Sequence, residues 1–420
     1  MMSAPSQRGI RSWALYDWAN SAFATVVLAG FFPILFQDFW NQGASSAVAS
    51  LRLGWANGLA SFLLIMIAPL IGAMADRAGI HKRALLSFAL IGAGATASLA
   101  LVPENAWAPA ATLFVLGTVC FMAANLFYDA LLISVAPPSL WHRVSGYGFA
   151  LGYLGGGLLY LGCVLAVLNP PWFGLVNELN AALAAFVVTG VWWVIFSLPL
   201  AWNVPERAPL AGDGAVMTGG LRQLRGTLTH LRAYRPVWLF LIAYWLYIDG
   251  LGTTIRMAVS YGRSLGFEQN DLIVALLITQ FVGFPAAIAM GRLGEWAGPR
   301  TGILVGLTGY VGICFWGALI TSPWEFYVIA GLIGLVQGGV QALSRSFYAG
   351  LIPPERAGEF FGFYNLLGKF AALIGPPLFG LFGVWFGDVR YSMLALILLF
   401  VAGALLLMRV DTEGGHDERA

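Results

Sequence analysis

Long apolar runs of about 20 residues or more alternate with short polar turns along most of the 420-residue chain. At a rise of about 1.5 Å per residue, such a run is long enough to cross a bilayer as a helix. The runs are continuous rather than alternating, so helices are favoured over a closed barrel. The pattern predicts twelve transmembrane helices, at residues 12–36, 53–75, 82–102, 107–135, 145–168, 180–203, 236–259, 269–292, 300–321, 325–350, 359–385 and 389–409.

The longest polar interruption divides six predicted helices from six. It predicts an N-terminal half over 1–203, a linker over 204–235, a C-terminal half over 236–410 and a tail over 411–420. Leucines recur every three or four residues within the linker, with arginines between them. That spacing indicates a basic amphipathic helix on the membrane surface, and a solvated loop is the alternative.

The basic residues are distributed unevenly over the turns. Most of the 22 Lys and Arg residues lie in the even-numbered turns, whereas only Arg52, Arg263 and Arg390 lie in the odd-numbered ones. Because Lys and Arg are costly to translocate, both termini and the linker are predicted to be cytoplasmic. Charged residues make up only 10% of the chain. We therefore expect an integral multi-pass protein of a bacterial inner membrane, whose basic residues set topology and do not bind nucleic acid.

The two predicted halves resemble each other in sequence. The proline pair at 137–138 recurs at 353–354, a shift of 353 − 137 = 216 positions. The turn at 72–79 recurs at 291–298, a shift of 291 − 72 = 219 positions. Both echoes fall at equivalent turns of the two halves. This predicts parallel six-helix repeats, which is how one large class of transporters is built.

The first of these turns carries a recognisable motif. The segment GAMADRAGIHKR at 72–83 resembles the signature loop of the major facilitator superfamily at Gly72, Asp76, Arg77 and Gly79. Ile80 departs from the pattern, because a basic residue is usual there. We expect Asp76 to face the positive N-terminus of the eleventh helix, near Glu359. The resemblance implies that this contact latches one access state, and the repeat adds Glu295 as the counterpart of Asp76.

Three further segments resemble a narrower group. They are WALYDWANSAF at 13–23, Asp249-Gly250 with TIR at 254–256, and QGGVQALSRS at 337–346. They are similar to the vacuole-effluxer-like branch of the superfamily, named for a fungal autophagy-related protein proposed to release amino acids from the vacuole. The resemblance implies an all-α fold of twelve transmembrane helices in two pseudo-symmetric six-helix halves. It also implies export of amino acids or similar small zwitterionic solutes.

Ionisable and strongly polar side chains within the predicted helices are the candidates for binding a substrate or a coupling ion. An ionised group inside the bilayer costs at least about 2.5 kcal/mol, so it normally faces a cavity or a partner. In the resembled fold the first, fourth, seventh and tenth helices line a central cavity, and most of the candidates lie on them. The candidates are Asp17, Asn20, Asp129, Asp249, Arg256, Gln341, Arg345 and Lys369.

Asp129 and Arg345 occupy equivalent positions, because 345 − 129 = 216 is the shift between the halves. Three roles are open for them: an ion pair that acts as a gate, a site for the two charges of a zwitterion, or separate local pairs that hold helices together. Asp17 or Asp249 could carry a coupled proton, since a buried carboxyl group takes up a proton more readily than an exposed one.

Together these features favour a secondary transporter that works by alternating access as a monomer in the lipid bilayer, without a cofactor or metal. Its partner would be a small-molecule substrate, and proton coupling stays open. The chain lacks a Walker motif for ATP hydrolysis and the clustered His, Cys or paired carboxylates of an enzyme site. A sugar or other small-solute carrier of the same fold, or a non-transporting receptor or scaffold, is the alternative.

Overall fold

The computed structural model describes residues 6–207, 209, 226, 235–264, 266–370 and 374–410, and this part of the chain is helical without a strand. The described helices follow the twelve predicted runs in order. They are α1 (Gln7–Ala22), α2 (Phe32–Asp38), α3 (Ser46–Ala78), α4 (His81–Ser98), α5 (Trp107–Val135), α6 (Trp141–Leu168), α7 (Glu178–Asn203), α9 (Arg235–Ser264), α10 (Gln269–Ala297), α11 (Pro299–Gly317), α12 (Pro323–Leu351), α13 (Ala357–Phe370), α14 (Gly375–Phe386) and α15 (Ser392–Leu407). A π-helix, η1 (Phe23–Phe31), joins α1 to α2, and short 3₁₀ turns are η2 (Leu99–Leu101), η3 (Pro138–Leu140), η4 (Pro170–Phe173), η6 (Pro354–Arg356) and η7 (Val389–Tyr391).

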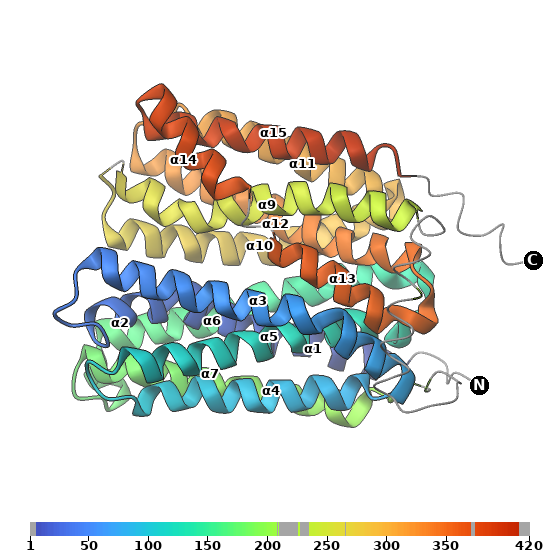
Figure 1. Cartoon of the computed structure of the whole chain (residues 1–420), viewed down its shortest axis with the longest axis horizontal. Coiled ribbons are helices and arrows are strands. Elements are labelled where there is room, and N and C mark those ends of the chain that lie inside the picture. Colours follow the sequence, from blue (N-terminus) through green and yellow to red (C-terminus); the bar gives the residue numbers. More distant parts are fainter. Residues whose placement is uncertain are drawn as a thin grey trace, which may run out of the picture.

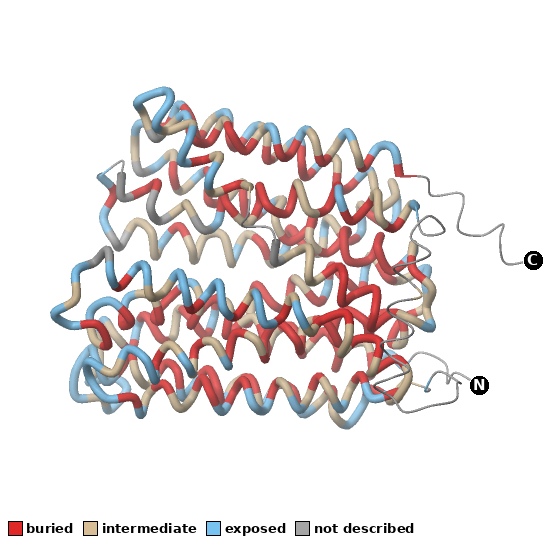
Figure 2. Tube along the Cα trace, viewed as in Figure 1, coloured by how far each residue is buried: buried red, intermediate tan, exposed pale blue. Residues whose placement is uncertain are grey.

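The helices run side by side in two groups, with α1 to α7 in one and α9 to α15 in the other (Figure 1). The start of α1 and the end of α15 lie at the same end of the molecule, which we call the termini end. Between the groups, α3 and α5 pack against α13, and α6 packs against α10 and α12. Buried residues are dense where the groups meet near the termini end (Figure 2). Most of the predicted linker helix and the whole predicted tail lie outside the described residues.

The outer surface suits a lipid environment. Among the described residues, nine helical segments are long and apolar enough to cross a membrane. Exposed tryptophans mark both ends of the helix bundle. Trp202 and Trp296 lie near the termini end, and Trp172, Trp324 and Trp385 lie near the opposite end. Tryptophan is enriched at the two membrane–water interfaces, so these side chains are placed to anchor the bundle at both.

The first helix differs from the regular helix expected over 12–36. It runs from Gln7 to Asp38, and its middle nine residues, Phe23–Phe31, have π-helical geometry. Stretches of π-helix are rare and are frequently found at functional sites. Thr25 on this stretch reaches the central cavity described below. The apolar pattern could not predict this π-helical stretch, because the same residues fit an α-helix equally well.

The sequence predicts a single eleventh helix over 359–385, and the structure instead has two helices in this range. α13 is described as far as Phe370, residues 371–373 lie outside the described part of the chain, and α14 begins at Gly375 after a bend at Ile374. Pro376 and Pro377 occupy the first turn of α14, where a missing N–H costs nothing. The proline pair therefore starts a second helix instead of bending a single one.

Candidate functional site

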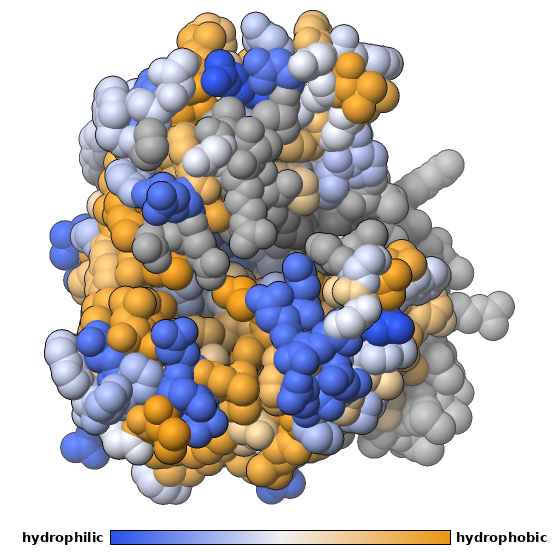
Figure 3. Space-filling model, turned by 90° about the vertical axis from the view of Figure 1, so that its left-hand side faces the viewer, coloured by the Kyte–Doolittle hydropathy of each residue, from blue (hydrophilic) through white to orange (hydrophobic). Residues whose placement is uncertain are grey.

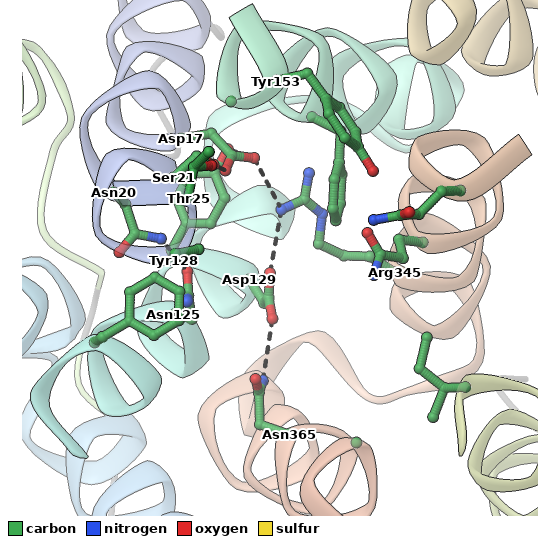
Figure 4. A pocket seen from close by; sticks show the side chains of 18 of the residues that line it. Asp17, Asn20, Ser21, Thr25, Asn125, Tyr128, Asp129, Tyr153, Arg345 and Asn365 are labelled. Atoms are coloured by element: carbon green, nitrogen blue, oxygen red, sulfur yellow. Dashed lines mark hydrogen bonds and ion pairs between the residues drawn. The ribbon is translucent and has the colours of Figure 1, made fainter. Parts of the chain in front are cut away.

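A cavity of about 360 Å³ lies between the two groups of helices, large enough for a small solute. Side chains from α1, η1, α5 and α6 face others from α9, α10, α12 and α13 across it (Figure 4). In Figure 3, which faces the end opposite the termini, the surface is hollowed between the two groups. The lining residues are Asp17, Asn20, Ser21, Ala24, Thr25, Phe121, Asn125, Tyr128, Asp129, Phe149, Gly152, Tyr153, Tyr244, Ile248, Gln280, Gln337, Gln341, Arg345, Tyr364, Asn365 and Gly368.

The Arg345 side chain extends from α12 toward the other helix group. There it is surrounded by Trp13, Tyr128, Asp129, Ser145 and Phe149, which we call the arginine socket. Its Nη1 donates to Asp129 Oδ1 over 3.2 Å. Its Nε donates to Ser145 Oγ over 2.9 Å, and its Nη2 donates to the Ser145 carbonyl over 3.0 Å. The guanidinium also lies over three aromatic rings. These belong to Trp13, Tyr128 and Phe149.

The charge of Arg345 is therefore matched and enclosed by one group of helices, although the residue belongs to the other. Only 2% of its surface is exposed. Removing one partner of such a buried pair typically costs about 3–5 kcal/mol, because the other charge is left uncompensated. The contact thus ties α12 firmly to α5 and α6.

Two carboxylates share this guanidinium. Asp129 accepts a second hydrogen bond, on Oδ2, from Asn365 Nδ2 at 3.0 Å, which links it to α13. Asp17 Oδ2 lies 3.9 Å from Arg345 Nη1, and its hydrogen bonds come from the hydroxyls of Tyr128 at 3.2 Å and Ser21 at 3.1 Å. Asp17 is thus the more loosely held of the two carboxylates at the cavity wall.

Neutral amides supply the remaining polar lining. Asn20 Nδ2 donates to Asn125 Oδ1 over 2.6 Å within one group of helices. Gln280 Nε2 donates to Thr25 Oγ1 over 3.0 Å and so joins the two groups. Gln341 lines the cavity one turn before Arg345 on α12. These residues offer both donors and acceptors for a polar solute.

Asp76 lies outside the cavity, where α3 meets α13. Its Oδ1 accepts from the Gly358 N–H and its Oδ2 from the Glu359 N–H, both at 2.8 Å. His81 Nε2 lies 2.9 Å from Asp76 Oδ1. A buried carboxylate therefore faces the positive N-terminus of a helix from the other group, as expected from the sequence. Its role as a latch stays a prediction.

The other residues of the signature turn have distinct surroundings. A Cβ added at Gly72 would overlap the Gly358 carbonyl oxygen, so the two backbones touch. Gly79 has φ +66°, a left-handed conformation that glycine adopts without strain. Arg77 is half-buried at the end of α3. Glu295 is exposed, and no hydrogen bond or ion pair joins it to another described residue, so the structure gives it no latch contact.

Asp249 is not brought into the cavity. It is fully buried, and its Oδ2 accepts from the Ile374 and Gly375 N–H groups at 2.9 and 3.0 Å. A carboxylate in this position satisfies the N–H groups at the start of α14, which have no partner within the helix. The side chains of Arg256 and Lys369 lie outside the described part of the structure.

Sequence reasoning missed the neutral half of the Arg345 socket. Ser145 is fully buried and bonds Arg345 through both its hydroxyl and its carbonyl. Trp13 and Phe149 contribute rings. Serine and aromatic residues are common in transmembrane helices, so their types carry no signal. The repeat shift offered one hint, because it placed Arg345 opposite Asp129, and Ser145 lies on the next helix.

Comparison with known proteins places the chain in a family. A family model described as vacuole effluxer Atg22-like matches residues 43–141 and 134–420. The Bacillus subtilis protein YxiO, described as an uncharacterized transporter of the major facilitator type, is 35% identical over 97% of this chain and 95% of its own length. Autophagy-related protein 22 of Eremothecium gossypii is 22% identical over 98% of this chain and 92% of its own length.

Solved structures share the fold. The human organic anion transporter MFSD10 superposes with a TM-score of 0.74 at 16% identity, covering 96% of this chain and all of that one. The transporter FucP in its outward conformation gives a TM-score of 0.71 at 12% identity, covering 96% and 98%. The predicted fold class and the family resemblance are therefore confirmed. Together with the nine apolar segments, they establish an integral multi-pass membrane protein.

Proposed function

Because the chain belongs to the vacuole effluxer Atg22-like family of major facilitator transporters, we propose that it exports a small zwitterionic solute, such as an amino acid, by alternating access. The single observation that carries this proposal is the buried Arg345 of α12, held by Asp129 and Ser145 of the other helix group beside a central cavity. The setting we propose is a bacterial inner membrane, with the termini end in the cytoplasm and the protein acting as a monomer.

We assign Arg345 and Asp129 to a gate rather than to a ligand site. In the described state, Nε, Nη1 and Nη2 of Arg345 each already donate to a protein acceptor. Three of its five N–H donors are thus engaged by the protein, and only 2% of the Arg345 surface is exposed, so little of the guanidinium is open to a substrate carboxylate. Opening at the termini end, by contrast, requires α12 to part from α5 and α6, and therefore withdraws Arg345 from its socket. The ion pair breaks once in each transport cycle.

The same geometry supports a proposal of proton coupling. When Arg345 withdraws, Asp17 and Asp129 are left near each other without their shared counter-charge. Like charges at a buried site favour uptake of one proton. Asp17 is our choice for the carrier, because its ion pair with Arg345 is longer than that of Asp129, at 3.9 Å against 3.2 Å. Asp249 is the weaker choice, since it does not line the cavity and its carboxylate accepts two backbone N–H groups at the start of α14.

Two assays separate transport from coupling. Purified protein in liposomes is loaded with a panel of unlabelled amino acids, peptides and sugars, and counterflow of the labelled solute is measured. We expect one amino-acid class to exchange. Asp17→Asn is expected to keep counterflow, which needs no net proton movement, and to lose accumulation driven by a pH gradient. Equal gradient-driven accumulation by Asp17→Asn and wild type would reject Asp17 as the carrier.

A sugar carrier is the second candidate, and the amides Asn20, Asn125, Gln280, Gln337 and Gln341 favour it, because sugars are recognised through many neutral hydrogen bonds. The same panel distinguishes the two. Counterflow of sugars alone would replace the amino-acid proposal while keeping the transporter. If no solute exchanges although the protein is folded and correctly inserted, the transport proposal gives way to a receptor or scaffold.

A further inference from the structure

The start of the linker lies on the signature turn. Val204 follows α7 and is buried, with 1% of its surface exposed. The Glu206 carboxylate accepts from the Lys82 N–H at 2.7 Å and from the Arg83 N–H at 3.2 Å. These are N–H groups of the first turn of α4, which have no partner within the helix. Glu206 therefore pins the linker to the turn between α3 and α4.

The turn in return has room for the linker only because Gly79 has no side chain. A Cβ added there would lie 2.6 Å from the Arg207 carbonyl oxygen and 2.8 Å from the Pro209 nitrogen. Both neighbours are backbone atoms, so they cannot rotate away. Gly79 thus serves the close approach of the linker as well as its own left-handed conformation.

Arg207 then crosses to the other helix group. Its Nη2 donates to the Pro354 carbonyl, in the turn that precedes α13. Burial lowers the pKa of Arg207, and the charges of Asp76 and Glu355 oppose that shift. The guanidinium therefore stays cationic and contributes positive charge near the Asp76 carboxylate. The signature turn itself has Ile80 where a basic residue is usual.

We propose that residues 204–207 form a strap across the termini end and that Arg207 is a positioning residue of the latch, supplying the cation that Ile80 does not. Arg207 joins the linker to the Pro354 turn, so its contact, like that of Asp76, has to break when the termini end opens. The strap thereby stabilises the state in which that end is closed. This inference rests on the alternating-access part of the proposed function.

The test measures opening directly, without a substrate. Spin labels are attached at Gln7→Cys and Thr301→Cys, which replace exposed residues at the termini end of α1 and α11. Cys120, Cys163 and Cys314 are buried, and buried thiols react slowly. The distance distribution between the labels is recorded in lipid nanodiscs by double electron–electron resonance. The fraction of molecules with the longer distance reports opening at this end.

Arg207→Met is expected to raise the ratio of open to closed molecules about tenfold, as for a lost hydrogen bond to a charged group. Arg207→Lys keeps the charge and one donor, so it should restore part of the closed population. Arg83→Met is the matched control. It removes the same charge from the same end, but the Arg83 side chain is 79% exposed and its one ion pair among the described residues, with Glu206, is long at 3.9 Å, so we expect no shift.

An unchanged distribution in Arg207→Met, alongside a clear shift in Asp76→Asn, would overturn the strap and leave the proposed function intact. Unchanged distributions in both would overturn the strap together with alternating access at this end. If Arg83→Met shifts the distance distribution as much as Arg207→Met, the loss of positive surface charge alone would explain the opening, and the strap would also be rejected. If Arg207→Met does not fold, Arg207→Gln, which keeps an amide donor, is read in the same way.

Discussion

Two contacts between the helix groups occupy repeat-related positions, and they are built differently. In the α3–α13 contact, a Cβ at Gly362 would lie 2.6 Å from Pro69 Cα. In the α6–α10 contact, a Cβ at Gly146 would lie 2.7 Å from the Ala287 carbonyl oxygen and 2.9 Å from Gly291 Cα. Gly146 and Gly362 differ by 362 − 146 = 216 positions, the shift that relates the halves. Both contacts therefore share glycines that let backbones touch.

Among the residues that the structure describes, only the α3–α13 contact carries a buried charge. Asp76 is 2% exposed and bonds two N–H groups of α13, whereas Glu295, its counterpart at 295 − 76 = 219 positions further on, is exposed. Close backbone packing is therefore present in both repeats, whereas a buried carboxylate bonded to a helix N-terminus is present in only one of these two described contacts. The α3–α13 contact can thus act as a latch, and the α6–α10 contact serves as a packed surface.

The largest expected effect comes from exchanging the two carboxylates for amides. Asp76→Asn turns an NH₂ donor toward one of the two α13 N–H groups and removes the charge, which we expect to weaken the closed state by about 2–3 kcal/mol. That corresponds to a rise of roughly 30- to 160-fold in the open-to-closed ratio measured with the Gln7 and Thr301 labels. Glu295→Gln should stay within about 0.5 kcal/mol of wild type, as exposed substitutions do. Equal shifts of the open-to-closed ratio in Asp76→Asn and Glu295→Gln would contradict the conclusion that only the α3–α13 contact depends on a buried charge.

The next effect tests the shared glycines. Gly72→Ala and Gly146→Ala each place a Cβ against backbone of the other group, and overpacking of this kind costs about 1–3 kcal/mol. Both variants should therefore open the termini end, and Gly72→Ala should do so more, because its Cβ would overlap the Gly358 carbonyl oxygen. Gly162→Ala is the control on α6, since a Cβ there meets nothing within 4 Å. A shift in the control as large as that in Gly146→Ala would contradict the packing explanation.

The smallest effect concerns the arginine socket between these contacts. Ser145→Ala removes the acceptor of the Arg345 Nε–H but leaves the Ser145 carbonyl, so we expect a loss of about 1 kcal/mol in the closed state. Transport should slow by several-fold without loss of the folded protein. Ser197→Ala on α7 is the matched control, because that buried hydroxyl bonds only within its own helix, to the Trp193 carbonyl over 2.6 Å. Identical transport rates in Ser145→Ala and wild type would show that the Ser145 hydroxyl does not contribute to the gate.

Much of the helical layout could be predicted from the sequence. Apolar length alone placed the fourth helix at 107–135, where the structure has it. The signature motif was enough to expect Asp76 at the N-terminus of the eleventh helix. The repeat shift paired Asp129 with Arg345, which bond across the helix groups. In each case a simple periodicity or a charge in an apolar run carried the information.

Other features depend on tertiary contacts that leave no local pattern. The break between α13 and α14 needs Asp249, more than a hundred residues earlier, to accept the N–H groups of Ile374 and Gly375. The same contact takes Asp249 out of the cavity, although the sequence made it a candidate proton carrier together with Asp17. The exposure of Glu295 could not be predicted from the sequence either. The repeat gives Glu295 the position equivalent to Asp76, but it does not indicate whether a helix N-terminus lies opposite that position.

The most direct test of the account is the distance between the Gln7 and Thr301 labels in Arg345→Lys compared with wild type. Lysine keeps the positive charge but has no planar fork to bond Asp129 and both Ser145 acceptors at once. We expect the open population to grow about tenfold or more while the folded protein is retained. An unchanged distance distribution would contradict the claim that Arg345, seated in its socket, holds the termini end closed.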